Sequence, residues 1–164
     1  MLPHPVRVTR VIPAPASAIF DLLADPGRHH DIDGSGTVTT SRGGHRRLKL
    51  GDSFGMDMHW GVNYSTRNDV VVFEEDRAIA WRTLAPMPLR LVLTGRTWRY
   101  DLRPVEGGTE VTETWDPTTE AFPSRLALGR LADLTRRNMT RTLARIEEIV
   151  TQENGTEESV TRGE

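Results

Sequence analysis

The chain has 164 residues, a length that suits one domain with a sizeable core. Its 21 Lys and Arg face 23 Asp and Glu, so the net charge of -2 offers no basic excess for binding a nucleic acid. The lack of cysteine excludes disulfides, thiolate nucleophiles and cysteine-based zinc sites. The sequence shows neither a signal-peptide pattern nor an apolar run near the roughly 20 residues that span a bilayer. We therefore expect a cytoplasmic protein without stable membrane insertion.

The first elements are predicted to be a strand and a short helix. Residues 6–12, VRVTRVI, alternate apolar and polar side chains as a half-buried strand does. Residues 15–25, PASAIFDLLAD, carry apolar side chains near helical spacing, and Pro15 suits a first helical turn. Asp25-Pro26-Gly27 should end that helix, and the threonine-rich stretch GTVTTS predicts a second strand.

Residues 48–116 are predicted to form an antiparallel meander. Alternating apolar and polar positions are separated there by turn signals such as Gly51-Asp52 and Gly107-Gly108. Each strand then has one apolar and one polar face. The residues of the predicted inner faces are Phe54, Met56, Met58, Trp60, Ile79, Trp81, Trp98, Tyr100, Leu102, Val111, Glu113 and Trp115. All four tryptophans fall on these faces.

The last element is predicted to be a long amphipathic helix from about Pro123 to Thr151. Its apolar stripe is Leu128, Leu131, Leu134, Met139, Leu143, Ile146 and Val150. Arginines occupy much of the remaining surface, as a solvated face or as a basic patch that neighbouring carboxylates dilute. The polar residues after 151 cannot bury enough surface to become ordered. We expect one domain over residues 1–151 and a flexible acidic tail over residues 152–164.

Residues 25–36, DPGRHHDIDGSG, concentrate two histidines, three aspartates and three glycines. A calcium loop with Gly36 as its turn glycine would place Arg42 where a bidentate Glu is required. His29 and His30 are adjacent and point in different directions, and neither has a Cys or an i, i+4 His partner to complete a zinc site. We therefore expect no metal, and a pair of turns around solvated histidines.

Several stretches together carry a resemblance to a known family. They are APASAIFDLLADPGRHHDIDGSGTV, LGDSFGMDMHWG, NDVVVFEEDRAIAWR, GGTEVTETWD and NMTRTLARIEEIV. In this order they resemble the START-like (SRPBCC) superfamily and, more narrowly, its polyketide cyclase/dehydrase and lipid-transport family. The resemblance implies an α+β helix-grip fold, with two short helices after the first strand and a curved antiparallel sheet wrapped around the long C-terminal helix. It also implies a cavity for an apolar ligand between sheet and helix.

The resemblance places His29, His30 and Ile32 at the cavity mouth, where they could contact or gate a ligand. The candidate ligand-binding residues are Phe54, Met56, Met58, Trp60, Trp81, Arg96, Trp98, Tyr100, Glu113, Trp115, Leu131 and Met139. Methionines beside rigid aromatic rings suit an apolar guest. The alternative is that this aromatic set is an ordinary core.

Glu113 shares its strand face with Val111 and Trp115, where an unpaired carboxylate is costly. It therefore needs a partner, for which Arg96 is a candidate, or a raised pKa. One alternative is a structural ion pair or a solvated glutamate at the rim of the sheet. The other is a group that orients a ligand hydroxyl or acts as a general base.

The sequence thus favours a carrier or sensor that binds a small hydrophobic molecule, a lipid or an aromatic, polyketide-like compound, without a cofactor. The alternative is an enzyme of the polyketide cyclase or dehydrase type, in which Glu113 and Tyr100 would be the catalytic residues. The sequence leaves the oligomeric state, including a homodimer, open.

Overall fold

The computed structural model of the chain describes residues 4–91, 95–121 and 130–161. Its strands are β1 (Val6–Ile12), β2 (Val38–Arg42), β3 (Ser53–Trp60), β4 (Val62–Glu74), β5 (Ala78–Leu84), β6 (Arg96–Val105) and β7 (Gly108–Asp116). Its helices are α1 (Ala16–Ala24), α2 (His29–Ile32) and α4 (Ala132–Thr161), with 3-10 turns η1 (Pro26–Arg28) and η2 (Leu89–Leu91). The predicted order of strand, short helices, strands and long helix is confirmed.

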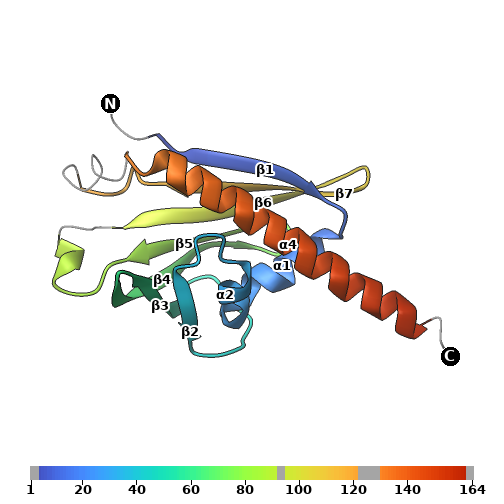
Figure 1. Ribbon diagram of the computed structural model, residues 1–164, viewed down its shortest axis with the longest axis horizontal. Helices are drawn as coiled ribbons and strands as arrows, with labels where there is room; N and C mark the ends of the chain where they lie inside the picture. Colours follow the sequence, from blue (N-terminus) through green and yellow to red (C-terminus); the bar gives the residue numbers. More distant parts are fainter. Residues whose placement is uncertain (1–3, 92–94, 122–129, 162–164) are drawn as a thin grey trace.

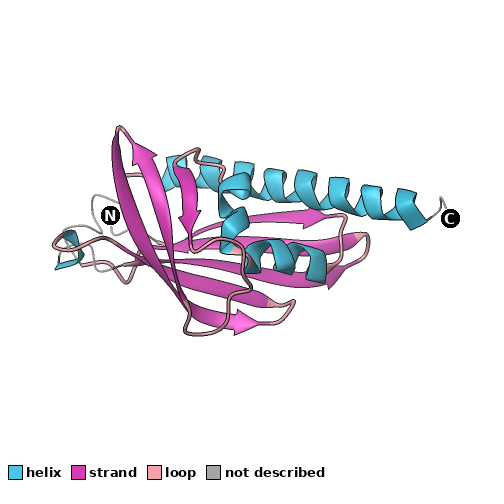
Figure 2. Cartoon of the chain, turned by 90° about the horizontal axis from the view of Figure 1, so that it is seen from below, coloured by secondary structure: helices cyan, strands magenta, loops and turns pink. Residues whose placement is uncertain are grey.

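The strands form one antiparallel sheet in the order β1-β7-β6-β5-β4-β3-β2. Strands β2 to β7 follow one another as the predicted meander, and β1 closes the series beside β7 (Figure 1). The pairing register shifts between Val38 and Thr40 and again between Val70 and Val72. Such irregularities increase strand twist and bending. At one end of the molecule the strands bend toward the side that carries α4 (Figure 2).

Helix α4 runs across one face of this sheet, which we call the inner face (Figures 1 and 2). Burial follows the helical period, because the apolar stripe of α4 turns toward the sheet. The fully buried members of this core include Ile19, Phe20 and Leu23 of α1, Ile79 and Val111 of the sheet, and Leu143, Ile146 and Val150 of α4. None of the described helices combines the length and apolarity needed to cross a membrane.

The bounds of α4 differ from those expected from the sequence. The expected start near Pro123 lies in residues 122–129, outside the described part of the chain. At the other end the helix continues to Thr161, so the expected end at residue 151 is wrong. The backbone hydrogen bonds of a helix can continue into a segment that has no apolar face. In this extension Arg28 also pairs with Glu153 at 2.7 Å. The flexibility expected of residues 152–164 stays a prediction.

The segment between α2 and β2 lies directly against α4. The Gly34 amide donates to the Thr142 hydroxyl at 3.0 Å, and Arg145 donates to the Asp33 carbonyl at 2.7 Å. A Cβ atom on Gly34 would lie 2.2 Å from the Asn138 carbonyl oxygen, which is closer than real atoms approach. This position therefore requires glycine.

Candidate functional site

A cavity of about 420 Å³ lies between the inner face of the sheet, α4 and the segment that runs from α2 to β2. Its wall on the sheet side is Met56, Met58, Trp60, Tyr64, Thr66, Trp81, Thr83, Arg96, Trp98, Tyr100, Glu113 and Trp115. Its wall on the helix side is His29, Ile32, Asp33, Ser35, Thr37, Val38, Leu131, Leu134, Thr135, Asn138, Met139, Arg141 and Thr142. The volume falls in the range of small-molecule sites.

Glu113 is buried in the wall of this cavity, with a relative exposure of 1%. Tyr100 stands directly opposite it on β6, and the Tyr100 hydroxyl donates to Glu113 Oε1 at 2.9 Å. Glu113 Oε2 has no hydrogen-bond partner among the described residues. Burial raises the pKa of Glu113 to about 8; the Tyr100 hydrogen bond lowers it, and the nearby Asp33 charge raises it. The carboxyl group is therefore mostly protonated at neutral pH.

Arg96, the partner proposed from the sequence, does not pair with Glu113. Its guanidinium lies 3.8 Å from Glu120, whose side chain is buried just after β7. Arg96 thus lines the cavity while it is directed toward another carboxylate. Tyr100 supplies the hydrogen bond that Glu113 needs, because cross-strand neighbours on one face lie close together.

His29 is buried with 3% exposure, so the expectation that it is solvated is wrong. The turn η1 directs the first residue of α2 inward, where the imidazole stacks on Trp81 with the ring centroids 4.9 Å apart. Its Nε2 lies 2.8 Å from the Leu23 carbonyl oxygen, which can only accept, so Nε2 carries the proton. Burial lowers the pKa of His29 to about 4, and the ring is neutral at pH 7.

Aromatic rings form a continuous part of the wall. Trp81 lies next to Tyr100 with centroids 5.6 Å apart, and Trp98 lies next to Trp115 at 6.3 Å. Trp81 and Trp115 are buried, and Trp98 is half-buried. The wall that faces a guest is therefore made of flat, apolar and weakly polar surfaces.

Trp60 and Leu134 mark the mouth of the cavity. Both line it, yet Trp60 is 64% exposed and Leu134 is 40% exposed. All four tryptophans thus line the cavity from the inner face of the sheet, as predicted, with Trp60 at its exposed edge. Trp60 is the last residue of β3, directly before the turn at Gly61. Strand alternation predicts which side of the sheet a residue faces, but it does not predict how far the elements that cover that side extend.

Two other predicted residues lie away from the cavity. Phe54 is buried in the core, where its ring packs edge-on against His29 and Trp81. His30 is exposed and pairs with Asp31 at 2.9 Å. Ile32, by contrast, is buried and does line the cavity.

The cavity also contains residues that the sequence reasoning did not single out. Tyr64 and Thr66 of β4 stand directly opposite Met58 and Met56 of β3. The pairing register would have revealed them, since directly paired residues point to the same side of a sheet. Asp33 accepts backbone hydrogen bonds from Ser35 at 2.9 Å and Val38 at 2.8 Å, so it shapes the loop rather than a metal site.

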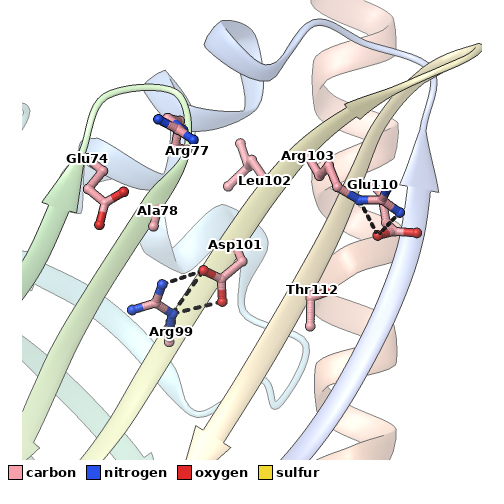
Figure 3. Close-up of a pocket in the computed structure, with 9 residues that line it drawn as sticks. All are labelled: Glu74, Arg77, Ala78, Arg99, Asp101, Leu102, Arg103, Glu110 and Thr112. Carbon is pink, nitrogen blue, oxygen red and sulfur yellow. Dashed lines mark hydrogen bonds and ion pairs between the residues drawn. The ribbon is translucent and has the colours of Figure 1, made fainter.

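A second hollow, of about 360 Å³, lies on the opposite face of the sheet. It is drawn in Figure 3, where α4 passes behind the strands. Its charged side chains largely pair with one another: Arg99 binds Asp101, and Arg103 binds Glu110 at 2.8 Å. Exposed ion pairs of this kind are typical of a solvated sheet surface, so we assign the site to the inner cavity.

A bent antiparallel sheet, a long C-terminal helix across it and a cavity between them define a helix-grip protein of the START-like superfamily. Residues 3–151 match the family described as polyketide cyclase / dehydrase and lipid transport, and the chain belongs to that family. The family resemblance and the fold class predicted from the sequence are confirmed.

Similar proteins support this assignment. The uncharacterized protein Rv0088 of Mycobacterium tuberculosis is 33% identical over 116 residues, which cover 68% of this chain and 48% of that protein. The chain thus spans about half the length of the curated relatives it matches. The di-domain ARO/CYC protein StfQ from the steffimycin biosynthetic pathway has a TM-score of 0.72 at 16% identity, over 94% of this chain and 53% of that one. Ara h 8.0201 has a TM-score of 0.62 at 11% identity, over 91% and 98%.

Proposed function

We propose that the protein binds a small, largely apolar molecule in the cavity between the sheet and α4, as a carrier or sensor. The cavity of about 420 Å³, walled by aromatic and methionine side chains, carries this proposal. Flat rings favour an aromatic or polyketide-like guest, and the adaptable Met56 and Met58 also suit a lipid. Lipid transport in the description of the family and the steffimycin pathway of StfQ support these two ligand classes.

A dye-displacement titration tests the proposal. The neutral dye N-phenyl-1-naphthylamine becomes fluorescent in apolar sites, and fatty acids, sterols and aromatic polyketides are then added as competitors. Thr135 of α4 is half-buried and lines the cavity, so Thr135→Trp places an indole ring where a ligand would bind. Thr140 lies on the same helix and is exposed, so Thr140→Trp is the matched control.

We expect Thr135→Trp to weaken dye binding at least tenfold and Thr140→Trp to leave it within about twofold. Failure of the dye and of every competitor to bind the folded wild-type protein would contradict the proposal. Equal weakening by both variants would place the dye on the surface, and would count against it as well.

A second candidate is an enzyme of the cyclase or dehydrase type, favoured by one observation: the buried contact between Tyr100 and Glu113. A raised pKa near 8 makes Glu113 a proton donor at neutral pH and a base only above it. Turnover of an aromatic poly-ketone should then be lost in Glu113→Gln while its affinity is kept. Unchanged turnover in this variant would exclude Glu113 from the chemistry.

A further inference from the structure

Three exposed apolar side chains lie around the mouth of the cavity. Trp60 and Leu134 line the cavity from opposite walls, and they are 64% and 40% exposed. Val62, which pairs with Trp60 across the β3–β4 turn, is 68% exposed. Paired residues point to the same side of a sheet, so Val62 continues the inner side of this hairpin. We call Trp60, Val62 and Leu134 the mouth patch.

The charges of α4 and of the turn before it are segregated along the chain. Residues 130–145 carry one acidic residue, Asp133, and five arginines: Arg130, Arg136, Arg137, Arg141 and Arg145. Residues 146–161 carry no cation and five glutamates: Glu147, Glu148, Glu153, Glu157 and Glu158. The helix macrodipole favours the opposite distribution, with acidic groups at the N-terminal end and basic groups at the C-terminal end. Helix stability therefore does not account for the arginines.

The arginine-rich half of α4 lies at the mouth of the cavity. Leu134, Arg137 and Arg141 follow the spacing of one helical stripe, and both Leu134 and Arg141 line the cavity. The beginning of α4, the β3–β4 turn and η2 lie at the same end of the molecule (Figures 1 and 2). Arg137 and Arg141 are exposed, and neither forms an ion pair with a carboxylate of the described residues. This end of the molecule thus combines exposed apolar side chains with uncompensated positive charge.

We propose that this end of the protein docks reversibly on a bilayer that contains anionic lipids, with the mouth patch in the interfacial layer and Arg137 and Arg141 against the headgroups. Tryptophan favours the membrane interface, and arginines near the surface are attracted to anionic lipids. A second copy of the chain fits less well, because a two-fold interface through this patch would bring the same arginines together. Docking would hold the mouth of the cavity against the bilayer. The inference goes beyond the proposed binding function and does not depend on it.

Co-sedimentation with sucrose-loaded vesicles tests the docking. One set of vesicles is phosphatidylcholine alone, and the other contains about 30% phosphatidylglycerol. We expect the wild-type protein to bind the anionic vesicles about tenfold more strongly at about 0.1 M salt, and to lose most of this preference at about 0.5 M salt, because salt screens the headgroup charge.

Two variants remove the contacts without altering a residue of the cavity wall. Arg137→Glu should weaken binding to the anionic vesicles about tenfold, and Val62→Ser about fivefold. The controls are Arg77→Glu, in the exposed turn after β4, and Leu50→Ser, at a 66% exposed position before β3. Both controls lie at the ends of these strands that are far from the β3–β4 turn. They should bind within about twofold of wild type.

Tryptophan quenching measures the insertion directly. Phosphatidylcholine with brominated acyl chains quenches indole rings that reach the bilayer, and Trp60 is the only exposed one of the four tryptophans. With this lipid in the anionic vesicles, we expect quenching in the wild-type protein and its loss in Trp60→Phe. Equal quenching in the two proteins would overturn the proposed orientation.

The remaining outcomes are equally decisive. The inference is overturned if the folded wild-type protein binds neither kind of vesicle or binds both equally, or if the variants and their controls lose the same affinity. A dimer that Val62→Ser dissociates, without vesicle binding, would assign the patch to a second copy of the chain. The dye titration decides the proposed function separately. A protein that binds the dye but no vesicles keeps that function, and one that binds vesicles but neither the dye nor any competitor loses it.

Discussion

The Tyr100 hydroxyl is the group that makes a buried Glu113 tolerable. It donates at 2.9 Å to one carboxyl oxygen and lowers the pKa of Glu113 against the larger opposing effect of burial. Burial raises the pKa of Tyr100 well above its usual value, and the adjacent carboxyl group of Glu113 raises it further, because both disfavour a phenolate. Within this pair the tyrosine therefore stays a donor over the whole neutral range.

The substitution Tyr100→Phe removes only this hydroxyl group. We expect Tyr100→Phe to raise the pKa of Glu113 above about 8 and to cost about 1 kcal/mol of unfolding free energy. The pKa is read from the carboxyl ¹³C shift of Glu113 in glutamate-labelled protein, with Glu113→Gln to assign the signal. Tyr64→Phe is the control, because Tyr64 lies on β4, two strands away from Tyr100 on β6 and three from Glu113 on β7. A lower pKa of Glu113 in Tyr100→Phe would refute the donor role.

Gly34 fixes how the loop after α2 lies on α4. Gly34→Ala would place a Cβ atom 2.2 Å from the Asn138 carbonyl oxygen and 2.5 Å from the Thr142 amide nitrogen. We expect a loss of about 2–4 kcal/mol in urea unfolding. Gly155→Ala, in open space within α4, should instead stabilise by about 0.5–1 kcal/mol. Equal effects of the two changes would show that the close approach is absent.

Glu153 lies in the last turns of α4 and contacts Arg28 of η1. Arg28 and Glu153 form a partly exposed ion pair there, which contributes little to stability. Truncation after Thr151 should therefore change the free energy of unfolding by less than about 1 kcal/mol in a urea titration. Val150→Ala, in the buried core just before the cut, should cost about 2 kcal/mol. A large loss on truncation would contradict the expected domain limit at residue 151.

At the scale of elements, alternation in the strands predicted most of the inner wall. Trp81, Trp98, Tyr100, Glu113 and Trp115 all lie where a period of two places them. The α2 region was not predictable in this way, because four residues of helix carry no periodicity and a histidine suits both a surface and a core. The burial of His29 depends on a partner, Trp81, that lies 52 positions further along the chain.

At the scale of the whole molecule, the sequence predicted the layers but not the limits of the cavity. The order of elements and their apolar faces determine which side of the sheet meets α4. Glu113 pairs with Tyr100 rather than Arg96 because of the register between β6 and β7. Trp60 is exposed because the elements that cover the inner face end before it. These are long-range properties, and local sequence patterns do not encode them.

The two buried titratable groups of the cavity give the molecule a characteristic pH profile. Glu113 has its pKa raised from 4.5 to about 8, so stability falls as pH rises from about 4.5 to about 8, because the unfolded chain loses the proton first. His29 has its pKa lowered from 6.5 to about 4, so stability rises over the interval from about 4 to about 6.5. Each slope is about 1.4 kcal/mol per pH unit, and between pH 4.5 and 6.5 the two offset.

We therefore expect thermal unfolding of the wild-type protein to show a nearly constant contribution from these groups up to pH 6.5, and then a loss of about 2 kcal/mol by pH 8. That loss corresponds to a fall of about 4–8 °C in Tm for a chain of this size. Glu113→Gln removes the falling slope, so its Tm relative to wild type should increase between pH 6.5 and 8. The difference between the two proteins cancels the exposed groups they share. Parallel Tm profiles from pH 6.5 to 8 would mean that Glu113 is already ionised in the folded protein.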